Sequence, residues 1–349
     1  MTQRHVLFEA DGLPTFQHRI YDSPDAALAC RKGDMRLVQD LNSGLIYNES
    51  FDPDLMVYDS NYNNEQSLSA SFQKHMDSVI GLLKSKFSRS GLVEIGCGKG
   101  HFFAQLLDAG FDVTGYDPTY EGDSPRIKKE YFTKDSGIRA EGIVLRHVLE
   151  HIPDPVGFLQ TIRDANGGGG LIYIEVPCFD WICENKTWFD IFYEHVNYLR
   201  ISDFKRMFGR ILHVERTFGD QYISLIADLS TLTVPTWTPD CAVDFPSDFF
   251  TLTPNALPAD MVIWGAGSKG VLYALHMARL NVRPSVVVDI NPAKQGKYLP
   301  ATGIEIVSPA TMLERAPADT TILIMNSNYH DEIRAQTENR FAYVLAEGL

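Results

Sequence analysis

The stretch Val93-Glu94-Ile95-Gly96-Cys97-Gly98-Lys99-Gly100 decides the fold of this chain. The apolar run from Leu92 to Ile95 predicts a short strand, and glycines follow it at alternate positions. Apolar residues at helical spacing come next and predict a helix. Glycine allows positive φ and lets the backbone pass close to a ligand. Strand, glycine turn and helix together predict the start of a nucleotide-binding α/β unit.

Two acidic residues indicate which ligand this unit binds. A carboxylate at Glu94 suits a ligand with an ammonium and a sulfonium group, and it would repel a pyrophosphate. The next predicted strand ends at Asp117, where an acid can accept hydrogen bonds from ribose hydroxyls. Together these residues resemble the first two motifs of the class I S-adenosylmethionine (SAM) methyltransferases. The resemblance implies SAM as cofactor, bound by Glu94, Gly96, Gly98, Gly100 and Asp117. We also expect Arg146 to bind the cofactor.

Length and composition narrow the class of protein. A chain of 349 residues predicts two or three domains. The net charge of -14 argues against a nucleic-acid partner. No signal peptide is visible and no apolar run is long enough to span a membrane, so we expect a cytoplasmic protein with no membrane partner. The five scattered cysteines are expected to be reduced thiols.

The order of patterns predicts the fold class. We expect an α/β protein with an N-terminal lid module (1–67), a Rossmann-like class I methyltransferase core (68–230), a proline-rich linker (231–260) and a second Rossmann-like lobe (261–349). The apolar face from Leu68 to Phe87 predicts a long helix before the first strand of the core. Gly219-Asp220 predicts a hairpin between two strands, which would end the core sheet with an antiparallel strand.

A second glycine turn, Gly265 to Gly270, opens the C-terminal lobe. With Asp289 about twenty residues further on, it matches the pattern of NAD-binding domains. The chain after Asp289 is too short for a full dinucleotide domain. We therefore favour a structural lobe over an NAD site.

The segment His147-Val148-Leu149-Glu150-His151 has the HxxEH spacing of some zinc sites on helices. An apolar strand precedes it and Pro153 follows, so there is little room for a helix with both histidines on one face. We interpret the segment as a loop after the fourth strand, with His147 pointing into the site and His151 structural. No metal is expected.

Tyr193-Glu194-His195 follows the fifth strand in an aromatic region. It offers a proton acceptor, an acid to orient it and a phenol. The alternative is an aromatic lid whose polar groups are merely hydrogen-bonded. Basic residues nearby could line a pocket for an anionic substrate or simply be solvated: Lys186, Arg200, Lys205 and Arg206.

Several motifs in order resemble the sugar C-methyltransferases that act on nucleotide-linked keto-deoxysugars. The matching segments are Glu94 to Gly100, Arg146 to Ile152, Ile174 to Pro177, Tyr193 to His195, Gly265 to Gly270 and Lys294 to Pro300. The resemblance implies a nucleotide-linked sugar as substrate. It also implies catalytic roles for Tyr193, Glu194, His195 and His147, and a substrate contact from Tyr62. We further expect Lys186 and Lys269 to bind the substrate.

One feature departs from that family. Its N-terminal module binds zinc through paired cysteines, whereas only Cys30 precedes Cys97 in this chain, so four thiolate ligands cannot be assembled.

The expected chemistry is removal of a proton next to a ketone, followed by attack of the enolate on the methyl group of SAM. We favour His195 as the base and Tyr193 as a hydrogen-bond donor to the enolate, and the motif leaves that order open. The alternatives are an O- or N-methyltransferase acting on a natural-product or polysaccharide intermediate, and a non-catalytic binding protein with the same fold. The oligomeric state is not indicated by the sequence.

Overall fold

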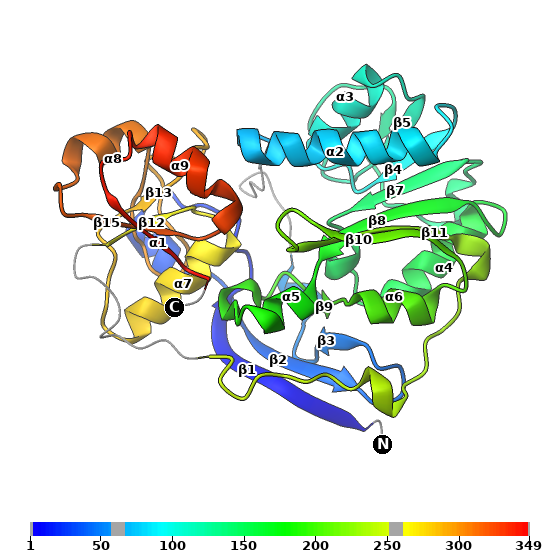
Figure 1. The fold of residues 1–349 in the computed structure, drawn as a ribbon, viewed down its shortest axis with the longest axis horizontal. Helices are drawn as coiled ribbons and strands as arrows, with labels where there is room; N and C mark the ends of the chain where they lie inside the picture. The colour runs from blue at the N-terminus through cyan, green and yellow to red at the C-terminus, as the bar shows by residue number, and fades with distance from the viewer. Residues whose placement is uncertain (1–2, 57–66, 251–260, 348–349) are drawn as a thin grey trace.

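The computed structural model describes residues 3–56, 67–250 and 261–347. Within these ranges the chain forms a four-stranded, a seven-stranded and a five-stranded sheet. Figure 1 shows the C-terminal lobe beside the central core, with the long N-terminal strands running below the core. Tyr62 and the last ten residues of the predicted linker lie outside the described residues.

The seven-stranded sheet has the order β10-β11-β8-β7-β4-β5-β6. Its neighbours from β8 to β6 pair in parallel, whereas β11 is antiparallel to both β8 and β10. This confirms the predicted core with a final antiparallel hairpin. The strands are β4 (Leu92–Ile95), β5 (Val113–Tyr116), β6 (Ile127–Lys128), β7 (Gly142–Arg146), β8 (Leu171–Pro177), β10 (Ile211–Thr217) and β11 (Tyr222–Asp228).

Helices cover both faces of this sheet. The helices α2 (Ala70–Lys86) and α3 (His101–Asp108) pack on one face, where α2 buries the stripe predicted for it: Phe72, Met76, Val79, Ile80 and Leu83. Each such side chain contributes about 1.5–3 kcal/mol of hydrophobic stabilisation. The opposite face is covered by α4 (Pro155–Ala165) and α6 (Ile201–Met207), and α5 (Phe179–Glu184) follows β8.

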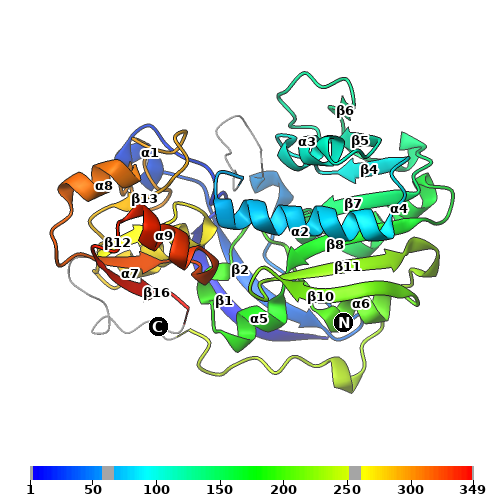
Figure 2. The ribbon, with the colours of Figure 1, turned by 45° about the horizontal axis from the view of Figure 1, so that its top comes forward.

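The N-terminal module is an antiparallel sheet in the order β1-β2-β3-β9. Its strands are β1 (Arg4–Pro14), β2 (Lys32–Asp40), β3 (Ile46–Asn48) and β9 (Asn197–Tyr198), with α1 (Pro24–Leu28) after β1. The sequence predicted a lid module here without assigning its strands, and the long β1 is visible in Figure 2. Because β9 comes from the core, the module is joined to the segment that follows Tyr193-Glu194-His195.

The C-terminal sheet is wholly parallel, in the order β14-β13-β12-β15-β16. It confirms the predicted Rossmann-like lobe. The elements are β12 (Met261–Trp264), α7 (Ser268–Arg279), β13 (Val287–Val288), β14 (Ile306–Val307), α8 (Pro309–Arg315), β15 (Thr321–Ile324), α9 (His330–Gln336) and β16 (Ala342–Leu345).

Polar contacts join this lobe to the core. The amides of Gln221 and Asn326 exchange two hydrogen bonds of 2.8 and 3.0 Å, and the Glu332 carboxylate accepts a 2.7 Å bond from the Ser69 hydroxyl at the start of α2. Within the described ranges, none of the helices combines the length and the apolar character that a membrane span needs.

Candidate active site

The first glycine turn leads from β4 to α3 with positive φ at Gly96 (76°), Gly98 (53°) and Gly100 (82°). A Cβ at Gly96 would lie 2.3 Å from Val148 Cγ2, so the turn packs tightly there. A Cβ at Gly98 would meet no atom of the described residues within 4 Å. The turn is therefore open at Gly98, where a ligand has room to approach the backbone.

Glu94 lies beside this turn at the end of β4. Its residue is 3% exposed, and Oε2 has no hydrogen-bond partner among the residues that the structure describes. Burial raises the pKa of Glu94 to about 7, although the positive charge of Arg146 acts to lower it. A buried carboxylate without a partner is costly, and a cationic ligand would relieve that cost. This donor set fits the ammonium and sulfonium of SAM.

Asp117 follows β5 and faces the same turn. Its Oδ2 accepts a 2.7 Å hydrogen bond from the Gly98 N–H, and Oδ1 accepts a 2.8 Å bond from the Thr119 N–H. The Thr119 hydroxyl also donates to Oδ1 at 2.7 Å, so the second lone pair of Oδ2 is the acceptor left for a ribose hydroxyl. The predicted acid therefore lies at the turn, in contact with Gly98.

Behind the turn, Glu175 at the end of β8 gathers several cationic or donor groups. Arg146 donates to its Oε1 from Nη2 at 2.8 Å, and the Tyr173 hydroxyl donates to Oε2 at 2.8 Å. His75 Nε2 lies 3.1 Å from Oε2. Burial alone would raise the pKa of Glu175. The interactions with Arg146, His147 and His75 lower it by more, and the pKa of Glu175 therefore lies well below its ordinary value.

Arg146 was predicted to bind the cofactor. Its guanidinium is held by Glu175 and lies 4.1 Å from the Phe102 ring centroid on α3. Its charge also acts on Glu94. Arg146 thus connects the glycine turn to Glu175 through its charge.

His147, the next residue after Arg146, also contacts Glu175. Its backbone has φ of 52°, rare for a residue with a side chain, and its N–H donates to the Glu175 carbonyl at 2.8 Å. Nε2 is 3.0 Å from Glu175 Oε1, without hydrogen-bond alignment, and Nδ1 is 3.5 Å from Glu150 Oε1. Burial lowers the pKa of His147, but these two carboxylates outweigh burial and raise it to about 9.

His147 borders a cavity of about 250 Å³ between the core and the C-terminal lobe. The carboxyl ends of parallel strands, where open α/β sheets bind ligands, supply one wall. The core side includes His147, Glu150, His151, Phe192, Glu194 and His195. The opposite side includes Gly265, Gly267, Ser268, Lys269, Asp289 and Lys294, and His18 comes from the N-terminal module.

His195 lies in the core wall of this cavity. Its ring packs on Phe192 with centroids 4.0 Å apart and meets the His151 ring edge-on at 4.9 Å. Burial and the neighbouring histidines hold the pKa of His195 well below its ordinary value. The imidazole is therefore uncharged at neutral pH.

Two family models match the chain. A methyltransferase domain matches residues 69–211, and a C-methyltransferase C-terminal domain matches residues 256–344. The chain is a SAM-dependent methyltransferase. SAM is accordingly its cofactor, as the first glycine turn predicted.

Solved structures resemble its core. A SAM-dependent methyltransferase from Mesorhizobium loti is 15% identical, with 44% of this chain and 99% of that chain covered and a TM-score of 0.35. Magnesium protoporphyrin IX methyltransferase from Synechocystis PCC 6803, with bound SAM, is 17% identical over 48% of this chain and 86% of that chain, with a TM-score of 0.33. Similarities of this size carry no conclusion about the substrate. No curated protein gave a significant match.

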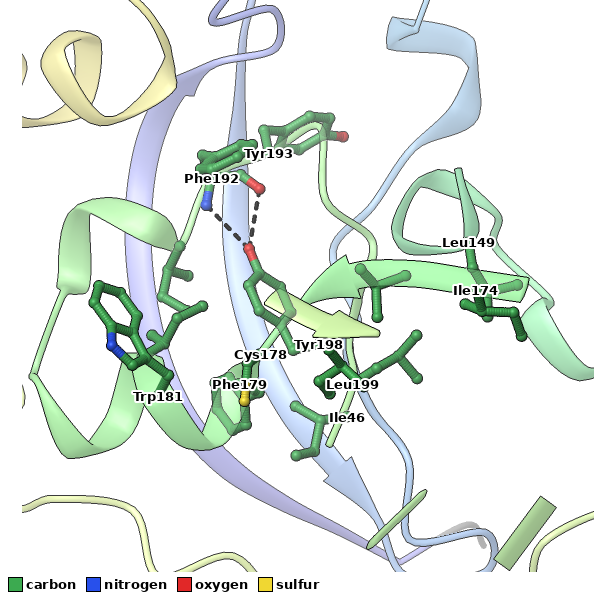
Figure 3. Close-up of a cluster of buried hydrophobic side chains, with 14 of the residues drawn as sticks. Ile46, Leu149, Ile174, Cys178, Phe179, Trp181, Phe192, Tyr193, Tyr198 and Leu199 are labelled. Atoms are coloured by element: carbon green, nitrogen blue, oxygen red, sulfur yellow. Dashed lines mark hydrogen bonds between the residues drawn. The ribbon is translucent and has the colours of Figure 1, made fainter. Parts of the chain in front are cut away.

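The structure places Tyr193 away from the cavity of this methyltransferase, against the sequence prediction. Its hydroxyl accepts a 2.8 Å hydrogen bond from the Asp52 N–H, and its ring packs on Phe51. Figure 3 shows Phe192 and Tyr193 pointing apart, with the Tyr198 hydroxyl bonded to the backbone N–H and carbonyl of Phe192. Tyr193 thus anchors the N-terminal module, and Phe192 faces the cavity.

Glu194 lines the cavity, but its carboxylate also holds the N-terminal module. Its Oε1 accepts hydrogen bonds from the backbone N–H groups of Gln17 (2.5 Å) and His18 (3.3 Å). The carbonyl of Glu194 lies 2.8 Å from His151 Nδ1. Glu194 therefore positions its neighbours, and His151, expected to be only structural, lies in the cavity wall.

The predicted substrate lysines have different positions. Lys186 is exposed, pairs with Asp248, and is not among the described residues that line the cavity. Lys269 does line it, 3.1 Å from both Asp190 Oδ2 and Gln221 Oε1. Of these two lysines, Lys269 is therefore the one that lines the cavity, as a paired cation.

Sequence reasoning missed cavity residues that come from distant segments. His18 Nε2 lies 2.8 Å from the Ser268 hydroxyl of the second glycine turn, and Tyr222 meets His147 edge-on at 4.7 Å. Neither His18 nor Tyr222 belongs to a motif, so no local signal distinguishes them from ordinary core residues.

Proposed function

We propose that this methyltransferase transfers a methyl group to a carbon next to a ketone in a nucleotide-linked keto-deoxysugar. The observation that carries the proposal is the position of His195. It lies in a cavity wall built by the core, facing a lobe that matches the C-terminal domain of C-methyltransferases. Carbon methylation needs a base at the reacting carbon, and we assign that role to His195.

His195 presents its imidazole to the cavity from the loop after α5. Because its pKa is held well below the ordinary value, this imidazole is uncharged at neutral pH and has a lone pair that can accept a proton. In the proposed reaction, it takes the proton next to the ketone and the electron pair forms the enolate, whose carbon attacks the methyl group. SAM, when bound, would supply that methyl group as its S–CH3 bond breaks and would leave as S-adenosylhomocysteine. A general base contributes about 10²–10⁴-fold to such a step.

The neighbours of His195 have supporting roles in this proposal. Phe192 fixes the plane of its ring, and Glu194 holds the segment around His18 against the cavity. His147 is proposed to contact the substrate carbonyl from the adjoining part of the wall. Tyr193 has no part in the reaction, because its hydroxyl is bonded to the Asp52 backbone outside the cavity.

The nucleotide part of the substrate is assigned to the C-terminal lobe. Gly267 and Ser268 begin α7 at the cavity, and the N-terminus of a helix favours phosphate groups. Lys269 and Lys294 lie at the same wall, paired with Asp190 and Asp289, so the start of α7 is the feature that favours a phosphate there. This arrangement supports an anionic, nucleotide-linked substrate.

The test is methyl transfer to a panel of nucleotide-linked keto-sugars and their hydroxylated analogues, with the product identified by NMR. We expect a new carbon–methyl bond in a keto-sugar. The His195→Asn variant should bind SAM and lose about 10²-fold or more in turnover. Methylation of oxygen or nitrogen in the hydroxylated analogues would overturn the proposal.

A second measurement isolates proton removal. With S-adenosylhomocysteine bound, the wild-type protein should exchange the substrate's α-hydrogen in deuterated water, and His195→Asn should not. Tyr193→Phe is the matched control, and it should exchange at the wild-type rate. If Tyr193→Phe abolished exchange while His195→Asn retained it, the assignment of the base would be reversed.

A further inference from the structure

Glu150, His151 and His195 bring three potential metal ligands together at the cavity. The ligand atoms that they offer all lie within 4.8 Å of one another. Two loops supply them, one after β7 and one before β9, and the Val196 N–H joins these loops with a 2.8 Å hydrogen bond to the Glu150 carbonyl. The cluster is therefore built by the fold rather than by one flexible segment.

His151 is oriented as a ligand. Its Nδ1 lies 2.8 Å from the Glu194 carbonyl oxygen, which can only accept, so Nδ1 carries the proton. Nε2 is then left with a lone pair. Histidines that bind metals commonly donate their other ring N–H to a carbonyl or carboxylate in this way.

Glu150 gives independent evidence for a cation. The residue is 2% exposed, and neither carboxylate oxygen has a hydrogen-bond partner among the described residues. The cationic side chain nearest to it, His147, has Nδ1 3.5 Å away. His147 shares its charge between Glu150 and Glu175, so the Glu150 oxygens still lack the close contacts that a bound cation would provide.

From this geometry we infer that Glu150, His151 and His195 bind a divalent transition metal such as Zn²⁺. Two imidazoles and a carboxylate suit zinc and its first-row neighbours, whereas Mg²⁺ and Ca²⁺ prefer oxygen ligands alone. The HxxEH spacing does not predict this set, because His147 is not a member and His195 comes from a different loop.

The effect of a bound metal on methyl transfer rests on the proposed function, in which His195 is the base. A metal on His195 occupies the lone pair that would accept the substrate proton. Metal binding and methyl transfer therefore exclude each other, and Zn²⁺ is expected to act as a reversible inhibitor at this site.

Calorimetry with untagged, metal-free protein and Zn²⁺ tests the site without any substrate. We expect Glu150→Gln and His151→Asn each to weaken Zn²⁺ binding at least tenfold, since even changes to groups behind the ligands cost about 10–100-fold. His330→Asn, which removes a partly exposed histidine paired with Asp331, is the control and should bind as the wild type does. Unchanged Zn²⁺ affinity in both ligand variants would overturn the site, as would equal binding of Mg²⁺.

Activity tests the consequence separately. Zn²⁺ should inhibit methyl transfer by the wild-type and His330→Asn proteins at the concentration at which it binds, and a chelator should restore turnover. Activation by Zn²⁺, or full activity with the site saturated, would overturn the mutual exclusion. If no keto-sugar is methylated at all, the proposed function fails while calorimetry still decides the metal site.

Discussion

The chain contains two units of strand, glycine turn and helix, and these differ in how their polar groups are satisfied. At the first turn, Glu94 Oε2 is buried without a hydrogen-bond partner in the described structure, and Gly98 borders open space. At the second turn, Asp289 Oδ2 accepts a 3.0 Å bond from the Ala266 N–H, and Lys294 Nζ lies 3.4 Å from the same oxygen.

Packing also differs between Gly98 of the first turn and Gly270 of the second. A Cβ at Gly270, in the first turn of α7, would lie 1.9 Å from the Gly265 carbonyl oxygen, a backbone atom that cannot move aside. Lys294 Nζ also donates to the Ala266 carbonyl at 3.0 Å, so the second turn is held by its own lobe. The same local motif therefore has two different roles. The first turn has a carboxylate oxygen and open space that a ligand can use, whereas the second turn stabilises its own lobe and directs the start of α7 toward the cavity.

The largest effect that this comparison predicts is on stability. Gly270→Ala should destabilise the protein by about 3 kcal/mol or more, because the new methyl group clashes with backbone. Thermal and urea unfolding measure this loss. Gly98→Ala is the matched control: its methyl meets open space, so it should cost about 1 kcal/mol for the positive φ and impair SAM binding instead. Equal destabilisation by both changes would contradict the contrast between the turns.

The next largest effect is a difference in SAM affinity between variants of Asp117, which follows β5, and of Asp289, which follows β13. Asp117→Ala removes an acceptor at the cofactor turn, and each charged hydrogen bond lost is worth about 1.5–3 kcal/mol. We therefore expect SAM affinity to fall by at least tenfold in calorimetry. In contrast, Asp289→Ala should leave SAM affinity unchanged and destabilise the lobe, because Lys294 would be left buried without its partner. Unchanged SAM affinity in Asp117→Ala would show that the first turn has been assigned wrongly.

Much of the fold could be predicted because its signals are local. The helix α2 has a long 3.6-residue apolar stripe, and Gly219-Asp220 marks the β10–β11 turn. In contrast, β1 has mostly exposed or half-exposed residues and two irregularities in its register, so no clean alternation marks it as a strand. The two-residue β9 exists only through its pairing with β3.

The site was predictable to the level of motifs rather than of individual side chains. The sequence indicated the Tyr193 to His195 segment, but consecutive aromatics carry no signal of which ring faces a cavity. Phe192 does so, because the Tyr198 hydroxyl fixes its backbone and Tyr193 is drawn to Asp52. Such choices depend on contacts with segments far away in the sequence.

The smallest predicted effect is a pH dependence at the first turn. Burial raises the pKa of Glu94 to about 7, from an ordinary value of 4.5, so the folded protein binds a proton there that the unfolded chain releases. Glu94 consequently favours folding least above pH 7 and most below pH 4.5.

Cofactor affinity should change with pH in the opposite direction and rise as the pH rises, because a cationic ligand needs the ionised carboxylate. We expect affinity for S-adenosylhomocysteine, which carries the same ammonium group, to rise about tenfold between pH 6 and pH 8. The Glu94→Gln variant should bind more weakly with a flat pH profile, whereas Asp289→Asn, at the second turn, should keep the wild-type profile. A wild-type affinity that does not change over this range, or a Glu94→Gln variant that retains the rise, would remove Glu94 from the cofactor site.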